Sequence, residues 1–365
     1  MRKSLVMKVR ESLTTHARMK IEQSFVDFRN AVNDWIKISI DNGWITTRTL
    51  QKFGYKELRE KYPNLYSAVL LEAMDVAIGC LKSVKSKGIV PEFDADIVCF
   101  KNQHYKLHSS GVIVPLCGEK TYIPLYIPKK FRKYLANYKL GRLTIFKRDN
   151  WYYVSISVKI EPPERKPTNV VGVDLGVHNF VVVADAKGRE LLRISGREII
   201  EYKKELEETY GKFQRYLMKF KNIKNTTYNR RYRHYSRYVN HCIAKKVVEV
   251  AKKYNAIIVL ENLKRIRGKS KSMRRLFRKW PYFDLIQKIE YKAKENGIPV
   301  VKVNPRNTSK TCSRCGYVNR RLKNERVFVC PKCGLEIDRD LNAAINIARK
   351  IACPPPLSPS VVRRD

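Results

Sequence analysis

The segment NPRNTSKTCSRCGYVNRRLKNERVFVCPKCGLEIDRDLNAAINI, residues 304–347, is the most informative part of the sequence. It holds two Cys-x-x-Cys pairs, Cys312 with Cys315 and Cys330 with Cys333, and a glycine follows each pair. Two residues between cysteines allow one tight turn to direct both sulfur atoms at one ion, and the glycine supplies the positive φ of that turn. The spacing therefore predicts a zinc ribbon with four thiolate ligands and one Zn²⁺.

Two disulfide bonds are the alternative use of these four cysteines. The chain begins MRKSLVMKVRESLTT, which lacks the apolar run of a secretory signal, and reduced thiols inside a cell favour metal over cystine. A four-cysteine site has no open coordination position, so we expect this zinc to be structural. Any chemistry is then expected outside the ribbon.

The residues directly after the ribbon have a helical pattern with a carboxylate on its apolar face. Asp340 precedes Ala343, Ala344 and Ile347 by three, four and seven residues, which places all of them on one side of a helix. Asp338 stands where an N-cap residue is expected. Asp340 is therefore expected to point toward whatever the helix covers.

The charge of the chain favours a polyanionic partner. Among 365 residues, 75 are Lys or Arg and 34 are Asp or Glu, giving a formal net charge of +41. A surplus can be only a solvated surface, but this one extends along the chain and favours nucleic acid. No segment approaches the roughly 20 apolar residues of a membrane span, so we expect a soluble intracellular protein.

The first part of the chain has strand patterns on both sides of a helical segment. Residues 5–10 alternate like a strand, one helix is predicted up to Gly43, and a second is predicted to open at Pro63 and to end near Gly88. From 91 to 160 the apolar residues recur with period two. We expect an antiparallel β domain of residues 1–10 and 89–160, with residues 11–88 as a helical insertion.

Three prolines predict a linker at 161–168, after which strands and helices alternate. The predicted order is three strands, a helical hairpin, a strand, a helix, a strand and a final helix. The predicted ranges are 169–176, 180–185, 190–194, 198–254, 256–260, 281–296, 298–303 and the helix after the ribbon. This is the element order of the RNase H-like fold. We expect a nuclease domain of residues 169–305 and 336–351, with the ribbon inserted at 306–335.

Two acids end predicted strands of this domain. Asp174 and Glu261 each follow an apolar run, and a helix laid across the sheet would bring Asp340 close to them. Three carboxylates repel one another unless cations bind. Two Mg²⁺ ions about 3.5–4 Å apart can then activate water and stabilise the leaving oxygen of a phosphodiester.

A competing interpretation concerns the sequence VGVDLG at 171–176. Actin-like ATPases and sugar kinases also place an Asp-x-Gly after a strand, where it binds phosphate. The chain has no second phosphate loop that matches theirs, and this interpretation explains neither the ribbon nor Asp340.

Over roughly residues 169–350 the chain resembles the TnpB, or OrfB, proteins of bacterial and archaeal insertion sequences. These are RNA-guided DNA nucleases related to type V CRISPR effectors. The resemblance lies in VGVDLG, IVLENL, the TSKTCSRCG-to-CPKCG ribbon and DRDLNAAINI. It implies that Asp174, Glu261 and Asp340 form a RuvC-like triad binding two Mg²⁺ ions, with Mn²⁺ as a substitute. It also implies a wedge-like β domain with a recognition-like helical insertion.

The resemblance implies partners and a cellular place as well. A guide RNA from the transposon end would pair with double-stranded target DNA, the protein would read a short flanking motif, and the setting would be the prokaryotic cytoplasm near the nucleoid, without a membrane. A non-cleaving guided DNA-binding protein and a DNA-joining transposase remain alternatives. The Pro-rich tail at 352–365 is expected to be disordered.

Two basic stretches are candidates for nucleic-acid contact. In the first, residues 228–238, tyrosines alternate with Arg230, Arg231, Arg233 and Arg237. A solvated helix whose tyrosines pack on a neighbour is the alternative. The second follows Glu261 as a predicted basic lid, and its candidate residues are Arg274, Arg275 and Arg278. Thr308 and Ser309 are expected to contact phosphate or, equally well, to make a turn.

Overall fold

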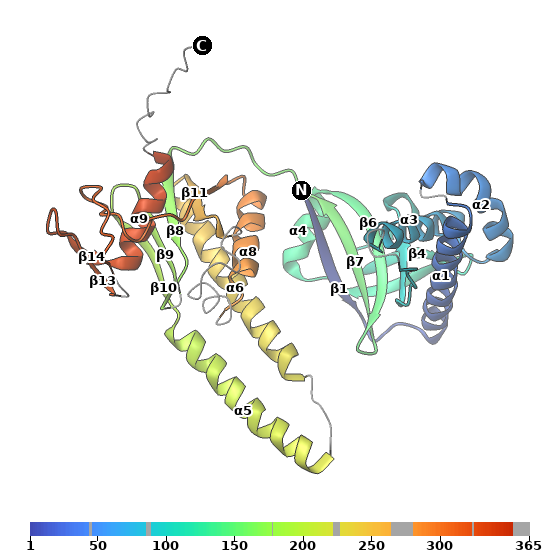
Figure 1. Cartoon of the computed structure of the whole chain (residues 1–365). Coiled ribbons are helices and arrows are strands. Elements are labelled where there is room, and N and C mark those ends of the chain that lie inside the picture. Colours follow the sequence, from blue (N-terminus) through green and yellow to red (C-terminus); the bar gives the residue numbers. More distant parts are fainter. Residues whose placement is uncertain are drawn as a thin grey trace. The chain divides into compact units, whose positions relative to one another are not determined.

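The computed structural model describes residues 1–43, 46–84, 89–176, 178–221, 227–263, 280–322 and 325–352, except for the side chains at 217, 220, 221, 227–230, 232 and 352. The predicted disorder of the tail therefore concerns residues outside the described part, apart from residue 352. The chain divides into two compact units, Met1–Glu161 and Pro162–Asp365, and each is described by itself (Figure 1).

The first unit contains a seven-stranded antiparallel sheet in the order β2-β6-β7-β1-β5-β4-β3. Its strands are β1 (Arg2–Val9), β2 (Ile97–Phe100), β3 (Lys106–Leu107), β4 (Gly111–Leu116), β5 (Glu119–Tyr126), β6 (Lys139–Arg148) and β7 (Trp151–Lys159). Asp149 and Asn150 both have positive φ between β6 and β7, as a two-residue hairpin turn requires. The strand patterns predicted after residue 91 are confirmed as strands.

The helices of this unit are α1 (Thr15–Asp41), α2 (Thr47–Lys61), α3 (Ser67–Val84) and α4 (Lys129–Asn137), with the short 3-10 helix η1 at Asn102–His104. The helix predicted up to Gly43 is confirmed as α1, and its buried Trp35 donates the ring N–H to Leu70 O at 3.1 Å. The second predicted helix is confirmed as α3, although it starts at Ser67 and not at Pro63, and α2, which precedes it, was not predicted. Within α2, Leu50, Gly54 and Leu58 alone are buried, which is too thin a stripe to stand out in the sequence.

The second unit is a mixed α/β structure around a five-stranded sheet in the order β10-β9-β8-β11-β12. Its strands are β8 (Asn169–Asp174), β9 (Asn179–Asp185), β10 (Glu190–Ser195), β11 (Ala256–Glu261) and β12 (Val300–Val303). The pairs β8–β9 and β9–β10 are antiparallel, whereas β11 runs parallel to both β8 and β12. The strands predicted from the sequence after the linker are confirmed.

Helices cover both faces of this sheet (Figure 1). The helices α6 (Thr227–Lys253) and α8 (Tyr282–Glu295) pack on the face that includes Val181 and Val183. The final helix α9 (Arg339–Ala352) packs on the opposite face, against Val182 and Ala184. The helix α5 (Arg197–Lys221) precedes α6, so the predicted basic hairpin is present as two helices.

The ribbon adds the small pair β13 (Val327–Val329) and β14 (Glu336–Asp338) between β12 and α9. Among the described residues, no helix is both long enough and apolar enough to cross a membrane.

Candidate nuclease centre and metal cluster

The register of two parallel strands places Asp174 beside Glu261. Val173 of β8 pairs with Leu260 of β11, and the two acids are the next residues of their strands. Because parallel strands end at the same edge of a sheet, both carboxylates lie at one edge. Both are partly buried.

Close packing of α9 brings Asp340 to the same edge. A Cβ atom on Gly172 would lie only 2.0 Å from Ala344 O and 2.5 Å from Ala348 N, so the helix backbone rests directly on β8. Asp338 Oδ1 accepts hydrogen bonds from the N–H groups of Asp340, at 3.1 Å, and Leu341, at 2.9 Å. The predicted N-cap is thus confirmed, and it sets the turn that carries Asp340.

The three acids, termed the acidic centre (Asp174, Glu261 and Asp340), interact electrostatically. Burial, followed by the charges of Glu261 and Asp340, raises the pKa of Asp174 well above its ordinary value, against the opposing effects of Arg339 and the Leu175 N–H. Burial also raises the pKa of Glu261, and this effect exceeds the opposing effects of a hydrogen bond from Thr308 and of the positive charge of Lys350. Carboxylates in this situation bind hard cations, because a cation relieves both the burial and the repulsion.

Three side chains hold the acidic centre from different elements. Thr308 Oγ1 donates to Glu261 Oε1 at 2.5 Å, Asn179 Nδ2 donates to Asp340 Oδ2 at 2.8 Å, and Arg326 Nη1 lies 3.4 Å from the same Asp340 oxygen. The Thr308 hydroxyl thus contacts an acid. Because Thr308 is only 5% exposed, this hydroxyl is not available to a nucleic-acid phosphate. Asn179 and Arg326 were not predicted, since nothing distinguishes them from the many other polar residues of the sequence.

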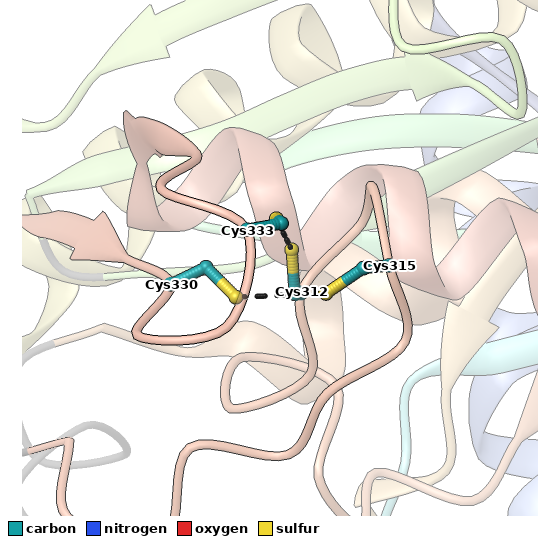
Figure 2. Close-up of side chains that lie close together, drawn as sticks. All are labelled: Cys312, Cys315, Cys330 and Cys333. Carbon is teal, nitrogen blue, oxygen red and sulfur yellow. Dashed lines mark hydrogen bonds between the residues drawn. The ribbon is translucent and has the colours of Figure 1, made fainter.

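The four ribbon cysteines, termed the cysteine cluster (Cys312, Cys315, Cys330 and Cys333), converge on one point (Figure 2). Their sulfur atoms all lie within 4.8 Å of one another, and the Cys312–Cys333 and Cys315–Cys330 pairs are 3.6 Å apart. A disulfide requires about 2.05 Å, whereas thiolates about 2.3 Å from a tetrahedral zinc lie roughly 3.8 Å apart. The arrangement fits a metal and not the alternative of two disulfides.

The two halves of the cluster have the same backbone turn. Gly316 N donates to Cys312 O and Gly334 N to Cys330 O, each at 3.0 Å, and both glycines have positive φ, as predicted. Although burial opposes the change, the N–H groups of Cys333 and Lys332 lower the pKa of Cys330 to about 6. This favours the metal-binding thiolate form at Cys330. Although the Leu335 N–H opposes the change, burial and the neighbouring cysteine side chains raise the pKa of Cys333 to about 12 in the absence of a metal.

Amide and guanidinium side chains attach the ribbon to α9. Asn342 Oδ1 accepts from Ser313 N at 2.9 Å, and Asn346 Nδ2 donates to Thr311 O at 2.6 Å. Arg349 adds a hydrogen bond from Nη1 to Ser313 O. Because Asp340 lies on this helix, α9 connects the cysteine cluster to the acidic centre.

The ligand atoms of the two sites differ in chemistry. Within the described part of the chain, the four sulfur atoms of the cysteine cluster form a group that could hold a metal ion. The carboxylate oxygens of the acidic centre instead suit hard cations.

The predicted nucleic-acid contacts on α6 are partly accessible. Arg231, Arg233 and Arg237 are exposed. Tyr238 is 69% exposed, but Tyr235 packs with its ring centroid 4.7 Å from that of Tyr202, as the packing alternative expected. The predicted contacts through the side chain of Arg230 and through Arg274, Arg275 and Arg278 concern groups outside the described part of the structure.

A basic and aromatic row that was not predicted crosses the sheet of the first unit. Lys8 pairs in register with Tyr126 on one side and Tyr153 on the other, and Tyr153 stacks on Phe146 with centroids 5.5 Å apart. Residues opposite each other on neighbouring strands point to the same face, so these four form one row. The Lys8 ammonium also lies 3.2 Å from the centre of the Trp151 ring.

Two protein families match the chain. Residues 153–272 match a family described as a probable transposase, OrfB_IS605, and residues 282–347 match one described as Cas12f1-like, TNB domain.

Two relatives each match more than half of the chain. The TnpB-like protein MJ0751 of Methanocaldococcus jannaschii is 30% identical over 59% of this chain and 79% of that protein. The CRISPR-associated endodeoxyribonuclease Cas12f1 of Sulfoacidibacillus thermotolerans is 32% identical over 55% of this chain and 50% of that protein. The chain thus spans about half the length of this larger relative, and 43% of a second Cas12f1 from Syntrophomonas palmitatica.

Solved structures share the fold over most of the chain. A Cas12f1–sgRNA–target DNA complex aligns with a TM-score of 0.67 at 16% identity, covering 95% of this chain and 98% of that one. The mini-RNA-guided endonuclease CRISPR-Cas_phi3 also gives 0.67, at 10% identity, covering 98% and 93%.

Proposed function

The chain belongs to the family of TnpB-like proteins, and on this premise we propose that it is an RNA-guided DNA endonuclease of an insertion sequence. Cutting would occur by two-metal phosphodiester hydrolysis at a RuvC-like site made of Asp174, Glu261 and Asp340. The observation that carries the proposal is the convergence of the three acids: Asp174 and Glu261 end adjacent parallel strands, and the charges of Glu261 and Asp340 act on Asp174. Such repulsion persists in a fold when a cation relieves it during function.

The strand order supports the RuvC-like assignment. Numbered within the second unit, the five strands run 3-2-1-4-5, with the fourth and fifth parallel to the first. Asp174 and Glu261 end the first and fourth of these strands. Asp340 comes from α9, which packs on the face of the sheet opposite to α6 and α8. This is the arrangement expected of an RNase H-like nuclease.

Two Mg²⁺ ions bound by the acidic centre would supply an activated water and stabilise the leaving oxygen of the phosphodiester. The protein's own residues would hold the ligands in place. The sheet orients Asp174 and Glu261, Thr308 restrains Glu261, and Asn179 restrains Asp340. Arg326 extends from the ribbon to Asp340 and is well placed to approach a phosphate near that acid.

The cysteine cluster would hold one structural Zn²⁺. Its four sulfur ligands leave no coordination position for substrate. Zinc there would stabilise the ribbon and, through Asn342, Asn346 and Arg349, the helix that carries Asp340.

A guide RNA and double-stranded target DNA are the proposed partners. The net charge of +41 supports a polyanionic partner, and exposed arginines on α6 offer phosphate contacts. The row Tyr126–Lys8–Tyr153–Phe146 adds stacking surfaces suited to bases or riboses. In this scheme the RNA reads the target by base pairing and the protein reads a short flanking motif.

The test is to purify the protein from cells that carry its native flanking DNA, sequence the copurifying RNA, and add matching DNA with Mg²⁺. We expect double-strand cleavage by the wild type and none by Asp174→Ala. Control DNA without sequence complementary to the RNA should stay intact.

Other outcomes separate the competing functions. Tight guided binding with no cleavage by the wild type would indicate a non-cleaving guided DNA-binding protein. Joined DNA products in a strand-transfer assay would indicate a transposase, which the description of the family matched at residues 153–272 allows.

A further inference from the structure

The loop between β12 and the ribbon folds back onto an acid of the acidic centre. Val303, the last residue of β12, pairs in register with Glu261, and the loop that follows returns Thr308 to the same carboxylate. Thr308 Oγ1 lies 2.5 Å from Glu261 Oε1 and 3.0 Å from Pro305 O. The hydroxyl has one hydrogen to donate. Because the contact with Glu261 is the shorter one, we assign this hydrogen bond to the carboxylate, as expected for a charge-assisted hydrogen bond.

The surroundings of this hydroxyl make it hard to replace. Thr308 is 5% exposed, so water has little access to take its place on Glu261. A carboxylate that loses such a donor regains rotational freedom about its side chain. For a metal ligand, that freedom lowers affinity, because the oxygen must be held where the cation binds.

Helix α9 holds the loop that carries Thr308. Asn346 Nδ2 donates to Thr308 O at 2.9 Å, and Lys350 Nζ donates to Arg306 O at 3.2 Å. The Lys350 charge also acts on Glu261 directly. Since Asp340 lies in the first turn of the same helix, the position of the hydroxyl is defined relative to Asp340 as well as to Glu261.

We propose that Thr308 is a positioning residue: its hydroxyl orients the Glu261 carboxylate so that the acidic centre binds divalent cations. This rests on the proposed function of that centre. The hydroxyl, and not the methyl group or the loop backbone, is assigned the effect. Thr311 provides a matched control in the same loop, because its Oγ1 donates to Asn307 O at 2.8 Å and not to an acid.

The experiment measures Mn²⁺ binding by electron paramagnetic resonance to the full-length protein with its copurified RNA and the cysteine cluster loaded. Thr308→Val removes the hydroxyl at nearly constant volume, and we expect its Mn²⁺ affinity to fall about tenfold or more. Thr308→Ser keeps the hydroxyl and should recover most of the affinity. Thr311→Val should bind Mn²⁺ like the wild type. The Mg²⁺ concentration for half-maximal cleavage should follow the same order.

Metal content of the cysteine cluster and thermal unfolding establish whether each variant is folded. If Thr308→Val loses the cluster metal, the comparison of Thr308→Ser with Thr308→Ala replaces it. Wild-type affinity in the hydroxyl-free variant, or equal loss in the serine variant, would overturn the role of Thr308 alone. If wild-type protein shows no Mn²⁺ site that Asp174→Ala removes, the proposed function of the acidic centre fails as well.

Discussion

The cysteine cluster and the acidic centre gather metal ligands in opposite ways. The four cysteines lie between residues 312 and 333, and two equivalent turns bring their sulfur atoms to within 4.8 Å of one another. The three acids lie at 174, 261 and 340, and the sheet and α9 bring them together against their mutual repulsion. In the cluster the proposed metal would stabilise the local fold, whereas in the centre the fold would impose the geometry on the metal.

The largest effect expected from this contrast is the loss of DNA cleavage in the variant Asp174→Asn. Cleavage should fall by on the order of a thousandfold, because several kcal/mol of transition-state stabilisation depends on the metal ligands. The fold should tolerate the change, since it removes a repelling charge from a buried site. Single-turnover cleavage and thermal unfolding of the same preparations provide the measurements. A destabilised Asp174→Asn would contradict the claim that the fold, and not the metal, assembles the acids.

Cys330→Ser should have the converse effect. We expect the cluster metal to be lost and the ribbon to become sensitive to proteases, while the sheet of the second unit stays folded. Cleavage should fall about a hundredfold, because Arg326 and the loop carrying Thr308 would lose their support. Metal content by mass spectrometry and limited proteolysis test this. Cys242→Ser, outside the cluster, is the control.

Arg326→Gln tests the link between the two sites. Its guanidinium is 44% exposed, so the free energy of unfolding should change by less than about 1 kcal/mol. Cleavage should still fall about tenfold, because a cation next to Asp340 is lost. Arg320→Gln removes the same charge from an exposed position of the ribbon. If both variants cleave equally slowly, the effect is one of general charge and not of the Asp340 contact.

The smallest expected effect is on the pH dependence of stability without added divalent cations. The folded-state pKa of Asp174 lies above its unfolded value. As pH rises from about 4, the unfolded state therefore loses this proton first, and the free energy of unfolding falls until the folded-state pKa is passed. Denaturant unfolding at several pH values should show this fall in the wild type, and a smaller one in Asp174→Asn. Added Mg²⁺ should also reduce this decrease in the free energy of unfolding.

Much of the second unit was predictable because its signals are local. The strands ending at Asp174 and Glu261 are continuous apolar runs, the cysteine spacing is specific, and Asp338 has the position of an N-cap. The first unit shows where such signals fail: α2 has few apolar positions and was missed. Contacts between distant residues, such as Thr308 with Glu261 or Arg326 with Asp340, leave no local pattern, so only the folded chain reveals them.

The N-cap of α9 affects where the chain can accept inserted residues. Asp338 ends the ribbon, but it caps the helix locally and also pairs with Arg193 of β10 at 3.2 Å. The start of α9, and with it Asp340, is therefore specified without reference to how many residues separate the two cysteine turns. Lengthening that segment costs only slowly rising loop-closure entropy, about 0.6 kcal/mol per doubling. Insertions between the turns are thus a tolerant route by which added sequence, natural or engineered, can be carried next to the acidic centre.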